Sequence, residues 1–173
     1  AYDATCSPKE VPNYSKELAS TKKYKIAYYK NALEHNGVDK EVRDASWQFI
    51  ERLKNEGHHV DAIEFDELEY IVPAYYVLTT AEASSNLSRY DGVKFGYHAK
   101  EAGDLESTYK LTRSQGFGKE VQRRIMSGAF VLSAGYYDAY YSKAQKVRRI
   151  VAEKTYKTFE SYDFIFCPTA PTP

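Results

Sequence analysis

The sequence predicts an α/β fold: a βαβ unit, then a mainly helical region, then a terminal strand. Three observations support this prediction. Two short β-prone runs flank an amphipathic segment, a long stretch has apolar residues at helical spacing, and a final apolar run ends at a proline. The 173 residues, 43% of them hydrophobic and 28% charged, are expected to form a single domain or part of one.

The first part of the chain contains the expected βαβ unit. Residues 1–21 include prolines and serines without a period of 2 or 3.6, so they are interpreted as an extended connector. Residues 22–67 form the unit, with strands at 25–29 (KIAYY) and 59–65, where apolar and polar residues alternate. Strands joined through a helix must be parallel, and their crossover is expected to be right-handed.

The helix between these strands has recognisable ends. Asp39 is a good N-cap residue, the helix should continue to about Glu56, and Gly57 should end it. The residues expected on its apolar face are Val42, Ala45, Phe49, Ile50 and Leu53.

Residues 68–162 are expected to be mainly helical, and residues 163–173 to form a strand and a loop. Helices are predicted over residues 68–89, 104–113, 119–132 and 136–159. Pro73 is tolerated because it lies near the start of the first of them. The last helix should present a stripe of apolar residues and an aliphatic stem: Ala139, Lys143, Val147, Ile150 and Val151. The strand at 164–167 is followed by Pro168, and no later segment could pair with it.

Charge, cysteines and hydropathy point to a cytoplasmic protein without a membrane span. Lys and Arg number 24, as do Asp and Glu, so no global charge favours nucleic acid or an anionic membrane. Cys6 and Cys167 are too few for a disulfide framework and are expected to be reduced. No apolar run of about 18 residues and no secretory leader is visible, so we expect a cytoplasmic location.

Most catalytic and metal-binding motifs are missing from the sequence. No G-x-S-x-G motif occurs, and Ser84 and Ser85 are better explained as small residues at a helix contact than as nucleophiles. His58 and His59 would point to opposite faces of a strand, which is poor geometry for a metal site. Residues 116–118 (GFG) lack the third glycine of a nucleotide loop and indicate a helix break. No metal site is therefore expected.

Adjacent arginines at 123 and 124 give the strongest hint of a binding site. Two neighbours on a helix cannot both face solvent in the same direction, so one of Arg123 and Arg124 should turn inward. An inward guanidinium needs a carboxylate partner. That partner could be internal, such as Glu82 or Asp138, or it could belong to a ligand.

Three segments carry a family resemblance: YYVLTTAEASSNLSRYDGVKFGYHAKEAGDL (75–105), SQGFGKEVQRRIMSGAFVLSAGYYDAYYSKAQKVR (114–148) and FCPTAPTP (166–173). They closely resemble the A subunits of tRNA-dependent amidotransferases, within the amidase-signature family. The strings AEASSNLSRYDG and GYYDAYY distinguish these subunits from general amidases. The resemblance covers about residues 25–173, and the start AYDATCS resembles the linker after the family's active-site half.

The resemblance implies an amidase-signature-type fold and a glutaminase that releases ammonia. The whole enzyme would form Gln-tRNA(Gln), or Asn-tRNA(Asn), by ATP-dependent transamidation of mischarged tRNA together with subunits B and C. The family's catalytic Lys and two Ser lie in a segment that this chain lacks, so no catalytic residue is assigned and the chain alone is expected to be inactive. Tyr75 and Arg124 match glutamine-contacting positions, with Arg124 clamping the α-carboxylate. No cofactor is expected in this chain, and ATP and Mg would be used by the whole complex.

Two alternatives remain from the sequence. The chain could act as a subunit-binding or scaffold module without catalysis of its own, using a helical face. It could also belong to a general amidase of the same superfamily that acts on free amides, although the subunit-specific strings disfavour this.

Overall fold

The fold is built around a small parallel sheet. The computed structural model describes residues 5–17 and 21–173. Strands β1 (Lys25–Tyr29), β2 (His59–Ile63) and β3 (Phe164–Phe166) form a three-stranded sheet in the order β2-β1-β3. β1 and β2 are parallel, with Lys25 opposite His59, which confirms the predicted βαβ pairing.

The terminal strand pairs with an earlier segment of the chain, which the sequence pattern did not identify. β3 runs parallel to β1 along the edge opposite β2, with Ile26 opposite Phe164. Asp163 secures its start, because its Oδ2 accepts from the backbone N–H of Lys25 (2.9 Å) and its own N–H donates to the Lys25 carbonyl oxygen (2.8 Å). A partner far earlier in the chain therefore completes this edge.

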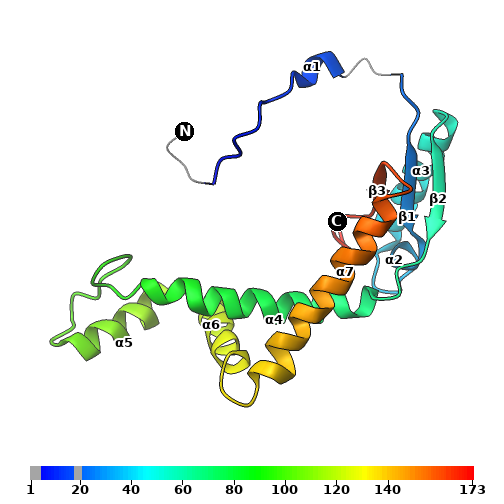
Figure 1. Cartoon of the computed structure of the whole chain (residues 1–173). Helices are drawn as coiled ribbons and strands as arrows, with labels where there is room; N and C mark the ends of the chain where they lie inside the picture. Colours follow the sequence, from blue (N-terminus) through cyan, green and yellow to red (C-terminus); the bar gives the residue numbers. More distant parts are fainter. Residues whose placement is uncertain (1–4, 18–20) are drawn as a thin grey trace.

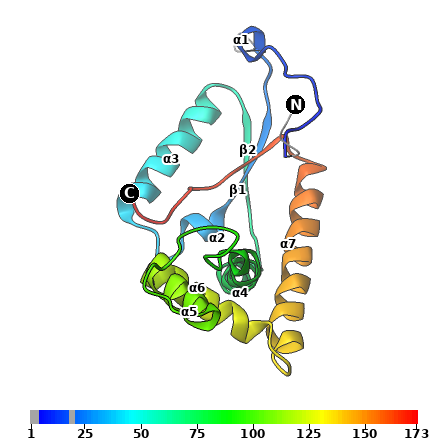
Figure 2. The same cartoon turned by 90° about the vertical axis from the view of Figure 1, so that its left-hand side faces the viewer.

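Helices lie on both sides of the sheet. α3 (Lys40–Asn55) is on one side and α7 (Lys143–Phe159) is on the other (Figure 2). The expected apolar face of α3 is partly wrong, since Ala45 and Phe49 are exposed and Ser46 and Ile50 are buried. The buried stripe is rotated because the sheet covers positions 46 and 50, one helical turn apart.

The core beneath the sheet is small. Its buried residues are Tyr28, Leu33 and Ile50, with Trp47, Val60 and Phe166 packed against them. Leu33 comes from α2 (Lys30–Leu33), a short helix after β1 that sequence periodicity did not predict. Four residues are too few to establish a 3.6-residue period.

The helical region follows the predicted order and is drawn in Figure 1. It contains α4 (Leu68–Asn86), η1 (Leu87–Arg89), α5 (Leu105–Gly116), α6 (Lys119–Val131), η2 (Tyr137–Ser142) and α7. Three of the four predicted helices are confirmed to within a few residues, and the fourth, predicted from residue 136, begins as an α-helix only at Lys143. η2 is a π-helix that was not expected, and it replaces the first turns of the predicted 136–159 helix. The expected connector includes the short helix α1 (Tyr14–Glu17), and residues 1–4 and 18–20 of that connector lie outside the described residues.

α4 is the central helix of this region, and α6 and α7 both pack against it. The contact between α4 and α6 is very close at Gly128, where a Cβ atom would lie 2.6 Å from Cβ of Ser84. Ser84 is therefore a small residue at a helix contact, as the sequence indicated. The stripe expected on α7 is covered only in part, because Val147 and Val151 are half-buried and Ile150 is exposed.

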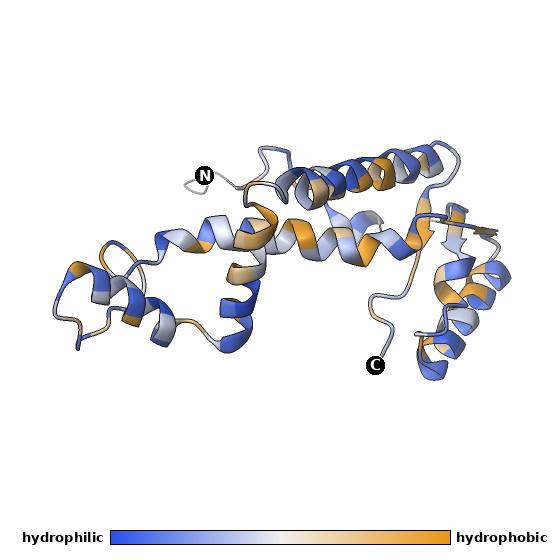
Figure 3. Ribbon diagram, turned by 90° about the horizontal axis from the view of Figure 1, so that it is seen from below, coloured by the Kyte–Doolittle hydropathy of each residue, from blue (hydrophilic) through white to orange (hydrophobic). Residues whose placement is uncertain are grey.

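The helical region leaves much apolar surface open. The accessible surface is 13123 Å², whereas a compact monomer of this mass exposes about 8,600 Å². Hydrophobic positions are spread along α4, the long helix at the centre of Figure 3, and Tyr70 and Val72 are 59% and 58% exposed. An apolar helix surface of this extent is typical of a face that another protein segment covers.

Candidate functional site

The site centres on the two arginines of α6. The side chain of Arg123 is 76% exposed and that of Arg124 is 36% exposed, so Arg124 is the one that turns inward. An internal carboxylate does pair with Arg124, but it is neither of the two candidates considered from the sequence, Glu82 and Asp138. Arg124 Nε instead donates to Oε1 of Glu120 over 3.1 Å, because Glu120 lies one turn earlier on the same helix.

Two tyrosines of α4 complete the cluster. The rings of Tyr75 and Tyr76 are 5.4 Å apart in an edge-to-face arrangement, and the Arg124 guanidinium lies 6.0 Å from the centre of the Tyr76 ring. Side-chain hydrogen bonding by Tyr75, followed by that of Glu120, raises the pKa of Arg124 above its ordinary value. The structure thus brings together Tyr75 and Arg124, the two residues that the sequence singled out.

The packing of α6 against α4 explains why Arg124 lies near Tyr75 and Tyr76, which are distant from it in the sequence. Gly128 lies against Thr80, and Arg124 and Tyr76 lie one turn before them on α6 and α4. Residues four apart share a helix face, so the close approach at Gly128 also brings Tyr76 toward Arg124.

The arrangement suits recognition of a carboxylate. Glu120 occupies the Nε side of the guanidinium, and a guanidinium presents five N–H donors in a planar fork. The Nη pair can therefore bind two carboxylate oxygens at once. Tyr75 adds an aromatic wall with a polar tip.

Tyr75 also lines an apolar cavity of about 290 Å³ between α4 and α7. Ile71, Leu78 and Val151 form part of its wall, and Glu82 and Arg148 are its charged lining residues. Arg124 is not among the residues that line it. Tyr75 therefore belongs both to the cluster around Arg124 and to the wall of a hollow that could take an aliphatic stem.

A second, polar cavity adjoins the first and was not predicted. It measures about 300 Å³ and shares Leu78, Glu82 and Arg148 with its neighbour. Tyr141 and Gln145 line it from η2 and α7, with Gln145 Nε2 donating to the Tyr141 hydroxyl over 3.0 Å. The tyrosine pairs at 136–137 and 140–141 were the available sequence signal, because a tyrosine combines an apolar ring with a hydroxyl that suits a polar cavity wall.

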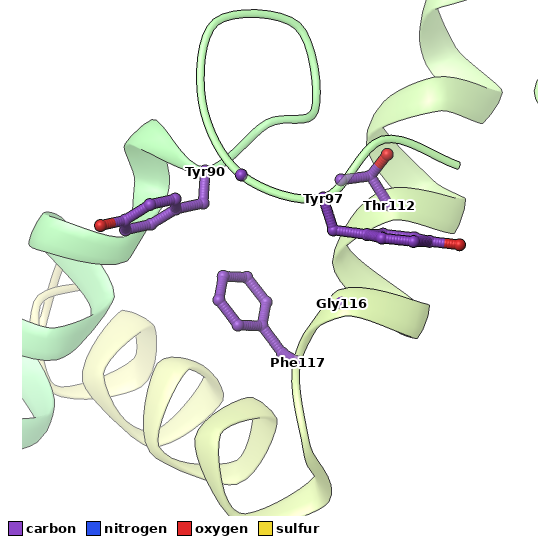
Figure 4. A pocket seen from close by; sticks show the side chains of 6 residues that line it. Tyr90, Tyr97, Thr112, Gly116 and Phe117 are labelled. Atoms are coloured by element: carbon purple, nitrogen blue, oxygen red, sulfur yellow. The ribbon is translucent and has the colours of Figure 1, made fainter. Parts of the chain in front are cut away.

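A third cavity, of about 170 Å³, lies between η1, the following loop and α5 (Figure 4). The rings of Tyr90, Tyr97 and Phe117 surround it, and the guanidinium of Arg113 lies 5.1 Å from the Phe117 ring centre. The Tyr97 hydroxyl donates to Gln115 Oε1 over 2.9 Å. The Tyr97 bond fastens this loop to α5, and the six residues that line the cavity carry no charged side chain.

The histidines serve local structure. His58 Nδ1 accepts from the backbone N–H of Tyr24 (3.1 Å), and His59 Nε2 lies 2.9 Å from Asp61 Oδ2. Within residues 5–17 and 21–173, no three His, Cys, Asp or Glu side chains gather as metal ligands would. Cys6 and Cys167 are free and exposed. Among the same described residues, no helix is both long and apolar enough to cross a membrane.

Comparison with known proteins assigns the chain to a family. The sequence model of the Amidase family matches residues 1–173. The A subunit of glutamyl-tRNA(Gln) amidotransferase from Staphylococcus epidermidis (strain ATCC 12228 / FDA PCI 1200) is 46% identical over 173 residues, covering 99% of this chain and 36% of that protein. The corresponding protein of Staphylococcus aureus (strain MRSA252) matches with the same identity and coverage. The chain thus spans about a third of the length of these relatives.

A solved structure is also similar. The A subunit of glutamyl-tRNA(Gln) amidotransferase from Thermotoga maritima aligns with a TM-score of 0.56 and 34% sequence identity, covering 86% of this chain and 27% of that one. This likeness confirms the expected amidase-signature-type fold. With a family model that matches along its full length, the chain belongs to the Amidase family.

Proposed function

We propose that this chain is part of the glutamine-hydrolysing subunit of a tRNA-dependent amidotransferase. The observation that carries the proposal is 46% identity over 99% of the chain to proteins named as the A subunit of glutamyl-tRNA(Gln) amidotransferase. The whole enzyme would release ammonia from glutamine and use it to amidate mischarged Glu-tRNA(Gln), or Asp-tRNA(Asn), in the cytoplasm. Subunits B and C would be its partners in a heterotrimer.

Within that enzyme, Arg124 and Tyr75 would hold the glutamine substrate. Arg124 would clamp the α-carboxylate through its Nη pair, since its Nε already bonds to Glu120. Tyr75, half-exposed beside it, would line the pocket wall. Their juxtaposition on α4 and α6 supports this assignment.

The covalent chemistry would come from residues outside this chain. Hydrolysis of an amide through an acyl-enzyme needs an activated nucleophile, and the described partners of Arg124 are Glu120, Tyr75 and Tyr76, none of which is a serine, cysteine or lysine. The chain alone is therefore expected to be inactive. ATP and Mg would be used by the whole complex, and no residue of this chain is assigned to them.

Glutaminase kinetics on the full-length enzyme test the proposal. Arg124→Ala should raise KM for glutamine by roughly 10- to 100-fold, because a bidentate charge-assisted contact is lost. Arg149→Ala is the matched control, since Arg149 forms a similar pair with Glu153 on α7 (2.7 Å). An unchanged KM in Arg124→Ala would remove Arg124 from the glutamine site.

A subunit-binding or scaffold role is a second candidate, favoured by the exposed apolar residues of α4. Such a role predicts that the isolated chain binds another component of the complex without glutamine. Pull-down of the purified chain with purified subunits B and C, measured with and without glutamine, would test it. No binding to either of them would exclude this role.

A further inference from the structure

We infer that Glu120 is a positioning residue that orients the Arg124 guanidinium for the carboxylate of the substrate. The inference rests on the proposed function, because it assumes that Arg124 binds the α-carboxylate of glutamine. It adds a residue that the resemblance did not supply and that the sequence did not single out.

Glu120 is held at both carboxylate oxygens. Its Oε2 accepts from Arg123 Nη1 over 3.0 Å, and its Oε1 accepts from Arg124 Nε over 3.1 Å. The three residues are spaced i, i+3 and i+4 on α6, so one turn of helix carries the whole chain of charges. Arg123 thereby fixes the carboxylate that in turn fixes Arg124.

Exposure divides the roles of the two arginines. The side chains of Arg123 and Glu120 are 76% and 59% exposed, whereas that of Arg124 is 36% exposed. Arg123 is thus the outer group, and it bonds to Glu120. Arg124 is the inner group, with the Tyr76 ring beside it.

Glu120 is attached to Arg124 at Nε, so Glu120 itself occupies neither Nη group. A bond to Nε restrains rotation of the guanidinium plane, while the two Nη groups keep the spacing that matches a carboxylate. A bond from Glu120 to the Nη pair would instead compete with a substrate carboxylate. The observed Nε contact therefore favours a supporting role over a blocking one.

The ion pairs of Glu120 with the two arginines add little to the stability of the fold. Exposed ion pairs contribute little to folding, since solvent screens them and ordering two long side chains costs entropy. The same restraint is useful at a binding site, because a side chain that is already ordered loses less entropy when the ligand binds.

The test compares two ligands on the full-length enzyme: glutamine, and glutaminamide, in which a carboxamide replaces the α-carboxylate. The measured quantity is the ratio of their dissociation constants, which reports recognition of the carboxylate. Glu120→Gln should reduce the preference for glutamine about tenfold and raise KM with little change in kcat. Glu153→Gln is the matched control, since it weakens an Arg Nε pair of the same i,i+4 type on α7.

Each outcome decides one part of the inference. Arg124→Ala should abolish the preference, and if the preference survives, the proposed function of Arg124 fails. If Arg124→Ala abolishes it but Glu120→Gln leaves it intact, the role of Glu120 alone is overturned. An equal loss in Glu153→Gln would also overturn it, because the effect would then be remote from the site. Thermal melting of each variant, measured alongside, confirms that all are folded at the assay temperature.

Discussion

Gly128 of α6 lies directly against the backbone of Thr80 in α4, at a distance that leaves no room for a methyl group. An added Cβ would overlap the Thr80 carbonyl oxygen and lie 2.6 Å from Cβ of Ser84. This contact sets how closely the two helices approach. It therefore also sets the distance between Arg124 and the tyrosines of α4.

Gly128→Ala should destabilise the protein by about 2 kcal/mol or more. Helix propensity alone would predict a gain of about 1 kcal/mol from this change, so the sign separates packing from propensity. Urea unfolding followed by circular dichroism measures the effect. Gly103→Ala is the control, because a Cβ added at Gly103 would meet nothing within 4 Å, and it should change stability little.

Local signals explain which parts of the fold the sequence could predict. Asp104 begins α5 with a capping box, and Gly57, with φ of +87°, ends the turn after α3. Such residues act on their own neighbours, so the helix ends could be placed without knowing the tertiary fold. The helix break at 116–118 was predicted for the same reason.

Contacts between distant parts of the chain explain which features the sequence could not predict. β3 pairs with β1 across 138 residues, measured from Lys25 to Asp163, and no local pattern encodes that pairing. The rotation of the α3 face likewise depends on where the sheet lies. Glu120 differs from these two cases, because its i,i+4 spacing to Arg124 is a local signal present in the sequence. The carboxylates considered for Arg124 from the sequence, Glu82 and Asp138, are more distant along the chain.

Thr112→Val should loosen the loop that precedes α5. The Thr112 hydroxyl accepts from the backbone N–H of Ala99 over 3.1 Å, and both residues are buried. Valine keeps the shape but leaves that N–H without an acceptor, which costs about 1–3 kcal/mol. Hydrogen exchange at the Ala99 amide should accelerate. Thr79→Val is the control, because Thr79 is more exposed and its hydroxyl bonds only within its own helix. Unchanged exchange at Ala99 in Thr112→Val would contradict the role of the hydroxyl.

α5 should lose stability in acid through its N-cap. Hydrogen bonds from the Ser107 backbone N–H (2.8 Å) and side chain hold the pKa of Asp104 below its usual range. A lowered folded pKa means that this contribution is fully present above the unfolded carboxyl pKa of about 4 and is lost as pH falls through the folded value. Amide exchange in α5 at pH 6 and pH 3 measures it. Asp104→Asn keeps the cap without the titration, so its α5 should show a smaller pH effect.

The exposed apolar surface of α4 should make the isolated chain self-associate. Tyr70 and Val72, at 59% and 58% exposure, belong to a helix whose hydrophobic residues extend around its circumference. Burial of apolar surface drives association in proportion to its area. Sedimentation velocity over a range of concentrations should therefore show a rising average mass, and Val72→Lys should reduce it.

Val93→Lys is the matched control for this surface, because Val93 is 57% exposed but lies in the loop before α5. Both variants add one positive charge, so a general effect of charge on solubility would lower association equally in the two. Loss of association in Val72→Lys alone would locate the contact on α4. A wild-type chain that stays monomeric at every concentration would show that the apolar surface of α4 is stable in water without a covering partner.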